Sequence, residues 1–259
     1  MALDEPALSP AARDLAQMVR HGWARTHAAA PDGVLSGLRT RADAMIAGDA
    51  PRDGLFFQHD SPTGAYEDLR FGDGWVGPSP AYRKIEGLER DPVFAEWIFG
   101  PVTRGFAQAA IDGPVAIART VLWTKAGVDQ GGGTELPWHQ DGGLFWGLSG
   151  QPTLQIWLAL DDTPVESGCV EVIADSHLGG LATPEGGTIP GELTAPRAAD
   201  VLPLPARAGE VLLLHNLVWH RSGRNRTRRV RRALSICLMS ASITCTRKRR
   251  APRRFERLY

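Results

Sequence analysis

The spacing of apolar residues changes character near residue 114. Before this point apolar positions recur at helical intervals, as at Leu15, Met18 and Val19. The pattern predicts helices through about residue 50, the second of them over residues 34–46. Residues 51–81 hold many glycines, prolines and aspartates with no sustained period, which predicts a long loop region.

Two further short helices are predicted over residues 83–88 and 92–110. The second stretch is divided at Gly100-Pro101, a pair typical of a break between elements. The sequence therefore predicts that residues 1–110 form a mostly helical N-terminal part with loops.

From residue 114 the apolar period becomes two, which is the period of a strand. Strands are predicted over residues 115–123, 153–160 and 230–238, with shorter ones near 169–173, 201–204 and 209–214. In the second strand one face is wholly apolar: Leu154, Ile156, Leu158 and Leu160. The opposite face holds Thr153, Gln155, Trp157 and Ala159. The strand over 230–238 likewise divides into Arg232, Leu234, Ile236 and Leu238 against Arg231, Ala233, Ser235 and Cys237.

Strands with an apolar outside and a small or polar inside suit a barrel that encloses a ligand and carries helices on its outer face. Many short strands divided by Gly/Pro turns favour a jelly roll. We therefore expect a mainly β protein with flanking helices, a double-stranded β-helix of the cupin type. Residues 1–259 fit one domain, with the jelly-roll core over 114–245 and an insertion or lid over 178–200.

Composition bears on the compartment of the protein and on its partners. No stretch reaches the length of apolar sequence that a membrane span needs, and three cysteines without metal-binding spacing favour a reduced, cytoplasmic protein. From residue 211 onward fourteen arginines or lysines stand against one acid. Aromatic residues do not interleave these basic clusters, so nucleic-acid binding is disfavoured.

Candidate chemistry begins with His139 and Asp141. In extended structure, residues two apart project from one face, and histidine with carboxylate forms two-thirds of the facial triad of non-haem iron oxygenases. The spacing alone is weak, because such short patterns recur by chance. His215 and His220 are the candidates for a third ligand, and they would face opposite sides of one regular strand. His220 shares its face with Ser222.

These segments together resemble the phytanoyl-CoA dioxygenase family of Fe(II)/2-oxoglutarate-dependent oxygenases. The likeness runs from about residue 82 to the C-terminus, through residues 138–143, 155–162, 166–169, 175–177 and 209–235. The resemblance implies the jelly-roll fold, Fe(II) and 2-oxoglutarate as cofactor and cosubstrate, and O2 as oxidant. It implies metal ligation by His139, Asp141 and His220, with His177 and His215 structural. Because Asp141 is present, halogenation is disfavoured.

The resemblance also assigns a cosubstrate pocket. Arg231 lies eleven residues beyond His220, where the family has the arginine that binds the distal carboxylate of 2-oxoglutarate. The further residues expected in this pocket are Ser222, Trp157, Lys125 and Gln155. The residues expected to contact the substrate are Leu144, Phe145 and Trp146.

The expected reaction is hydroxylation of a C–H bond of a small molecule, such as a bacterial secondary metabolite. Desaturation, epimerisation and ring closure use the same cofactor set and stay open as alternatives, as does the oligomeric state. A non-enzymatic alternative is a cupin-like protein that binds a metal or nucleic acid without turnover.

Overall fold

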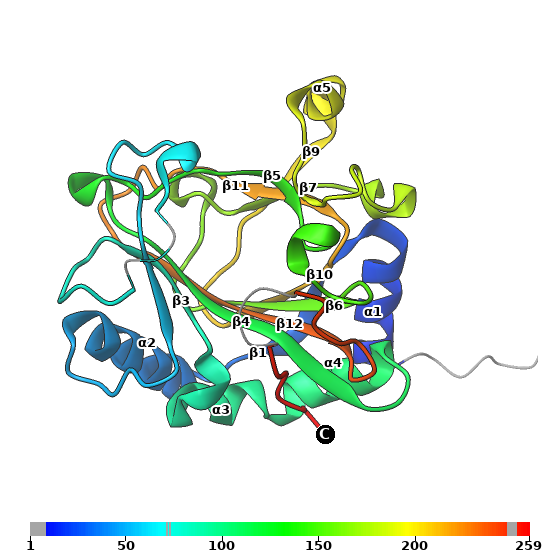
Figure 1. The fold of residues 1–259 in the computed structure, drawn as a ribbon, viewed down its shortest axis with the longest axis horizontal. Helices are drawn as coiled ribbons and strands as arrows, with labels where there is room; N and C mark the ends of the chain where they lie inside the picture. The colour runs from blue at the N-terminus through cyan, green and yellow to red at the C-terminus, as the bar shows by residue number, and fades with distance from the viewer. Residues whose placement is uncertain (1–8, 71, 73, 248–252) are drawn as a thin grey trace, which may run out of the picture.

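Two antiparallel sheets facing each other form the body of the protein (Figure 1). The computed structural model describes residues 9–70, 72, 74–247 and 253–259. Within these residues the larger sheet has seven strands, in the order β1 (Trp23–Ala29), β10 (Glu210–His215), β6 (Leu154–Ala159), β12 (Arg231–Ser240), β4 (Val115–Lys125), β3 (Tyr82–Glu86) and β2 (Phe56–His59). The smaller sheet, over the same described range, has five, in the order β8 (Gly187–Thr188), β5 (Leu136–Gln140), β11 (Trp219–Ser222), β7 (Val170–Ile173) and β9 (Val201–Leu204). The predicted mainly β fold with flanking helices is confirmed.

Helices cover the face of the larger sheet that points away from the smaller one (Figure 1). They are α1 (Pro10–His21), α2 (Asp32–Ala47), α3 (Pro92–Ile98) and α4 (Pro101–Ala110). The Ser9 hydroxyl caps α1 by accepting a hydrogen bond from the Ala12 amide at 3.2 Å, and Gly22 ends the helix at φ 82°. The predicted break at Gly100 separates α3 from α4.

The two faces of β6 and β12 divide as the sequence predicts. The apolar outer residues of both strands are fully buried against the helices, whereas Trp157, Ala159 and Ala233 lie between the two sheets. Because Ala233 pairs with Ala159 and Ser235 with Trp157, the inner faces of the two strands are in register. This inner surface forms the floor of the pocket described below.

The predicted helical character of the first fifty residues is wrong for one segment. Residues 23–29 form β1, which lies at the edge of the larger sheet and pairs Trp23 with Leu214 of β10. The partner strand is far away along the chain, so local periodicity carries no sign of this pairing.

The predictions of a loop over 51–81 and a helix over 83–88 also need correction. Residues 56–59 form β2, which pairs with β3, and β3 continues the sheet through Ile85 opposite Leu122 of β4. A helical turn appears only afterwards, as a 3₁₀ turn over Leu88–Arg90. The run of apolar and charged residues in 83–88 has helical spacing, but its pairing with β2 on one side and β4 on the other decides the structure.

The predicted insertion over 178–200 is partly built into the smaller sheet. Thr188 of β8 pairs with His139 of β5, so this strand covers the edge next to a candidate metal ligand. The short helix α5 (Gly191–Thr194) extends beyond the sheets at the top of Figure 1. No helix in the described part of the chain has the length and apolar character needed to cross a bilayer.

Candidate metal and cosubstrate site

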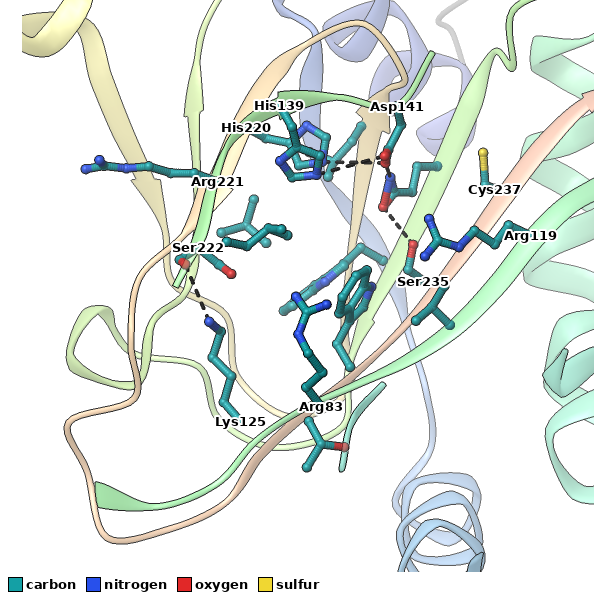
Figure 2. Close-up of a pocket in the computed structure, with 18 of the residues that line it drawn as sticks. Arg83, Arg119, Lys125, His139, Asp141, His220, Arg221, Ser222, Ser235 and Cys237 are labelled. Carbon is teal, nitrogen blue, oxygen red and sulfur yellow. Dashed lines mark hydrogen bonds and ion pairs between the residues drawn. The ribbon is translucent and has the colours of Figure 1, made fainter. Parts of the chain in front are cut away.

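Three metal-ligating side chains meet at one end of the space between the sheets (Figure 2). His139 and His220 are directly paired across β5 and β11, so both rings project from the same face. Asp141 follows β5 immediately. The ligand atoms of the three residues all lie within 4.8 Å of one another. The Asp141 carboxylate is 3.9 Å from His139 Nε2 and 3.5 Å from His220 Nε2.

Backbone carbonyls orient both imidazoles. His139 Nδ1 lies 2.9 Å from the Pro137 carbonyl oxygen, and His220 Nδ1 lies 2.9 Å from that of Val218. An imidazole whose Nδ1 donates to a carbonyl presents Nε2 as the free electron pair. Both rings therefore offer Nε2 to the same point beside Asp141.

The charges of the three groups depend on one another: against the effect of burial, the hydrogen bond and charge of Asp141 raise the pKa of His220. Burial, together with the neighbouring His220, lowers the pKa of His139 to about 3, so this ring is neutral. Burial alone would raise the pKa of Asp141, but the hydrogen bond and charge of His220 outweigh it and lower that pKa, so the carboxylate is ionised. Two imidazoles and one carboxylate on one side of an open space form the donor set of a facial triad.

Asp141 is held by polar residues on β6 and β12. Gln155 donates from Nε2 to Asp141 Oδ2 at 2.6 Å, and the Ser235 hydroxyl donates to Gln155 Oε1 at 2.7 Å. Asn216 donates to the Asp141 carbonyl oxygen at 3.2 Å. Gln155, which the sequence assigned to the cosubstrate, makes its hydrogen bonds here with Asp141 and Ser235, so its contacts orient the carboxylate.

Arg231 brings a buried cation into the same pocket. It lies on the inner face of β12, is 3% exposed, and places its guanidinium carbon 5.4 Å from the centroid of the Trp157 ring. Its Nη2 donates to the Gly168 carbonyl oxygen at 2.8 Å, but its buried Nε has no hydrogen-bond partner, and no carboxylate among the described residues forms an ion pair with it. Burial lowers the pKa of Arg231 to about 10.

Lys125 and Ser222 stand beside this guanidinium. Lys125 is paired directly with Arg231 across β4 and β12, and its Nζ donates to the carbonyl oxygens of Thr134 at 2.7 Å and Ser222 at 3.4 Å (Figure 2). Burial and the nearby Arg231 charge lower the pKa of Lys125 well below its usual range. Lys125 therefore adds a second buried hydrogen-bond donor beside Arg231.

The other histidines singled out in the sequence lie outside the pocket lining. His215 Nδ1 accepts a hydrogen bond from the Leu217 amide at 3.1 Å, and the His215 ring centroid is 4.8 Å from that of His177. His177 Nε2 is 2.9 Å from the Val19 carbonyl oxygen. These contacts join the 3₁₀ turn over Ser176–Gly179 to α1 and to the end of β10, and agree with a structural role.

The three residues predicted to contact the substrate differ in burial and in whether they line the pocket. Trp146 is buried and lines the pocket. Leu144 and Phe145 are 73% and 65% exposed and do not contribute to its lining. Consecutive residues of a 3₁₀ turn point in different directions, so only Trp146 is retained as a pocket residue.

Three arginines of the pocket were missed in the sequence: Arg83, Arg119 and Arg221, of which Arg221 forms an ion pair with Glu171 at 2.6 Å. Arg119 has the strand parity of Trp123 and Lys125 on the inner face of β4, so the alternation already noted could have found it. It donates to Glu86 at 2.7 Å, and this ion pair outweighs burial and raises the pKa of Arg119. Arg83 also lines the pocket, but it lies in the segment wrongly predicted to be helical.

Known proteins of one family are similar to this chain. A model of the family described as phytanoyl-CoA dioxygenase (PhyH) matches residues 87–233. The chain is 34% identical over 122 residues to phytanoyl-CoA dioxygenase domain-containing protein 1 of Bos taurus, covering 43% of this chain and 42% of that protein. It is 26% identical over 185 residues to the Mus musculus protein of the same name, covering 67% and 62%. The matches span about two-fifths to three-fifths of the curated relatives' length.

Solved structures share the fold at low identity. The epimerase SnoN, in complex with Fe3+, alpha ketoglutarate and nogalamycin RO, superposes with a TM-score of 0.75 at 18% identity, covering 96% of this chain and 98% of that one. EctD from S. alaskensis, with 2-oxoglutarate and 5-hydroxyectoine, gives a TM-score of 0.73 at 20% identity, covering 99% and 87%.

Proposed function

Since the chain belongs to the phytanoyl-CoA dioxygenase family of Fe(II)/2-oxoglutarate-dependent dioxygenases, we propose that it hydroxylates a C–H bond of a small molecule. Such a reaction consumes O2 and 2-oxoglutarate and releases succinate and CO2. We further propose that residues 1–259 act as one dioxygenase domain in the cytoplasm.

His139, Asp141 and His220 would hold the iron. Their Nε2 atoms and carboxylate face one point, and the backbone bonds to both Nδ1 atoms keep the rings in the ligating tautomer. The Gln155–Ser235 pair keeps the Asp141 carboxylate from rotating, and so preserves the open side of the triad. When bound, iron and 2-oxoglutarate supply the activation of O2 that no amino-acid side chain provides.

The observation that carries this proposal is that the buried Arg231 forms no ion pair with any carboxylate in the described part of the chain. A buried guanidinium without a carboxylate is costly, and it persists where a ligand completes the pair. The distal carboxylate of 2-oxoglutarate offers the planar, bidentate partner that the guanidinium fits. Ser222 and Lys125 would add donors beside that carboxylate, and Trp157 would form the wall of the subsite.

Epimerisation or ring closure is the second candidate reaction. SnoN is described as an epimerase and SnoK, another structure of this fold, as a carbocyclase. The same triad supports both outcomes, because the substrate's position relative to the iron selects the bond that reacts. A secondary metabolite is the substrate class that these relatives suggest.

Succinate formation tests the proposal directly. Purified protein given Fe(II), 2-oxoglutarate and O2 should release succinate without added substrate, and removal of the metal with a chelator should stop it. If the protein supplied with Fe(II), 2-oxoglutarate and O2 formed no succinate and did not bind 2-oxoglutarate, the proposed activity would be contradicted. Mass spectrometry of a substrate panel then separates hydroxylation, which adds one oxygen atom, from ring closure, which removes two hydrogens, and from epimerisation, which leaves the mass unchanged.

A further inference from the structure

Arg83 owes its position in the pocket to a β-bulge. In β3, Lys84 and Glu86 lie opposite Trp123 and Val121 of the inner face, while Ile85 is buried in the outer core. Strict alternation would place Arg83 on the outer face with Ile85. The register with β2 shifts at this point, from Gln58 opposite Lys84 to His59 opposite Tyr82. Arg83 therefore has no residue of β2 paired opposite it. A bulge of this kind re-aims a side chain, and here it turns Arg83 inward.

The turned side chain is buried but incompletely satisfied. Arg83 is 7% exposed, and its guanidinium carbon lies 5.3 Å from the ring centroid of Trp123. One of its nitrogens donates to Gln58 Oε1 at 3.0 Å, and no ion pair reaches it from the described residues. Burial lowers the pKa of Arg83, and the charge of Asp60 opposes this without forming an ion pair with it. The Asp60 carboxylate accepts backbone hydrogen bonds from Ser61 and Thr134.

Arg83 differs in this respect from the other cations of the pocket. Arg119 is paired with Glu86, Arg221 is paired with Glu171, and Lys125 donates to two backbone carbonyls. Arg231 is accounted for by the carboxylate of the cosubstrate. One bound divalent cation, one Asp141 carboxylate, a 2-oxoglutarate dianion and one Arg231 sum to no net charge, so these four groups leave no charge that would neutralise Arg83.

The direction of Arg83 agrees with a role toward a ligand. Figure 2 shows its guanidinium pointing from the strand toward the triad end of the cavity, between Lys125 on one side and Arg119 with Ser235 on the other. Aromatic rings of Trp123 and Trp146 line the same cavity. A molecule that filled this space would meet, at one end, a planar donor that has no ion pair with the described residues, and apolar rings along its body.

We propose that Arg83 binds an oxyanion group, a carboxylate or a phosphate, on the substrate that is oxidised, and that the aromatic rings beside it receive an apolar or aromatic body. This inference rests on the proposed function, because it concerns the second ligand of the same pocket. A guanidinium holds either oxyanion through two parallel hydrogen bonds, which fixes orientation as well as affinity.

Paired probes test the inference on the intact protein. The protein is first loaded with Fe(II) and saturating 2-oxoglutarate without O2, and binding of each probe is then measured by calorimetry. The probes are benzoate against benzamide and phenyl phosphate against phenol, so each anion has a neutral partner of the same body. The wild type should bind at least one anion about tenfold or more tightly than its neutral partner, and the anion that wins identifies the group.

Three variants complete the test. Arg83→Gln should weaken the preferred anion roughly a hundredfold while its neutral partner changes little. Arg83→Lys keeps the charge but loses the fork and should retain an intermediate affinity. Arg228→Gln removes a charge from a side chain that is 86% exposed, and should change nothing.

Binding of 2-oxoglutarate is titrated separately for every variant and should stay within about twofold of the wild type, which also shows that the pocket has folded. Equal affinity of the wild type for both members of each pair, or an Arg83→Gln protein that keeps its anion affinity, would overturn the inference and leave the proposed function intact. If the wild type did not bind 2-oxoglutarate at all, the proposed function would be contradicted instead.

Discussion

Replacing Arg231 and Arg232 separately by methionine provides a sharp test of the cosubstrate subsite. The two residues are neighbours in β12, but Arg231 faces the pocket and Arg232 faces the helices. Arg232 is held by Asp161 at 2.9 Å and Asp43 at 2.6 Å, whereas Arg231 has no ion pair among the described residues. The same substitution therefore removes a ligand-binding charge in one case and a structural ion pair in the other.

The two substitutions should change thermal stability in opposite directions, and only one of them should change 2-oxoglutarate affinity. Without Arg231, the distal carboxylate of 2-oxoglutarate would be buried unpaired, which costs roughly 3–5 kcal/mol, or about two to four decades in Kd. In the ligand-free protein, burial lowers the pKa of Arg231 from 12.5 to about 10, a penalty on the charged form of about 3 kcal/mol. Arg231→Met should therefore raise Tm while it weakens cosubstrate binding by these two to four decades. Arg232→Met should lower stability by roughly 1–3 kcal/mol and leave 2-oxoglutarate affinity unchanged.

The assay combines a calorimetric titration of 2-oxoglutarate into metal-loaded protein with a thermal melt of the ligand-free protein. Fe(II) affinity serves as the control, since neither arginine contacts the triad. If Arg232→Met lost cosubstrate affinity and Arg231→Met kept it, the strand register would be wrong by one residue. If Arg231→Met both bound 2-oxoglutarate normally and melted at a lower temperature, the pairing role of Arg231 would be refuted.

Other predictions concern the triad and its surroundings. His220→Ala should abolish Fe(II) binding, while His215→Ala should largely keep it, and a metal titration with the reverse order would refute the assignment. Asp141→Ala should lose most succinate formation, and a wild type that incorporates chloride into product would argue against an oxygenase. Gln155→Leu should weaken Fe(II) binding about 10-fold to 100-fold by releasing the carboxylate, with Ser235→Ala smaller in the same direction; equal metal affinity in all three proteins would contradict this. Burial lowers the pKa of His215 from 6.5 to about 4, so this group makes the unfolded chain bind more protons between these values, and stability should fall as pH drops from about 6.5 to about 4; melts of His215→Gln should show a shallower fall.

Strand parity explains why much of the site could be predicted from the sequence. In a strand, residues separated by an even number of positions share a face, so Arg231 and Ser235 could be placed on the inside of β12 without coordinates. The same reasoning favoured His220 over His215, and the structure places His220 opposite His139. The resemblance to a family supplied the remaining step, because spacing alone does not bring together residues from β5 and β11.

The elements that were missed depend on contacts that are remote in sequence or irregular in register. β1 forms because β10 offers a free edge, and a strand of only seven residues with mixed exposure shows little alternation of its own. Arg83 could not be assigned to the pocket even with β3 correctly predicted, because the bulge reverses its parity. Bulges arise from pairing between strands, and so a single strand's pattern contains no signal for them.

The residues proposed to bind metal and cosubstrate and the residue proposed to bind the substrate lie in different parts of the chain. The match to the family covers residues 87–233, which include the triad and Arg231, while Arg83 and the β2–β3 pair precede it. The shared chemistry requires a fixed geometry, and regularly paired central strands provide it. An edge pair can shift its register by one residue at little cost to the core, and each shift re-aims a different side chain into the same cavity. Substrate selection through such an edge can therefore change while the metal and cosubstrate sites stay in place, which is why family membership defines the oxidation and leaves its target to residues such as Arg83.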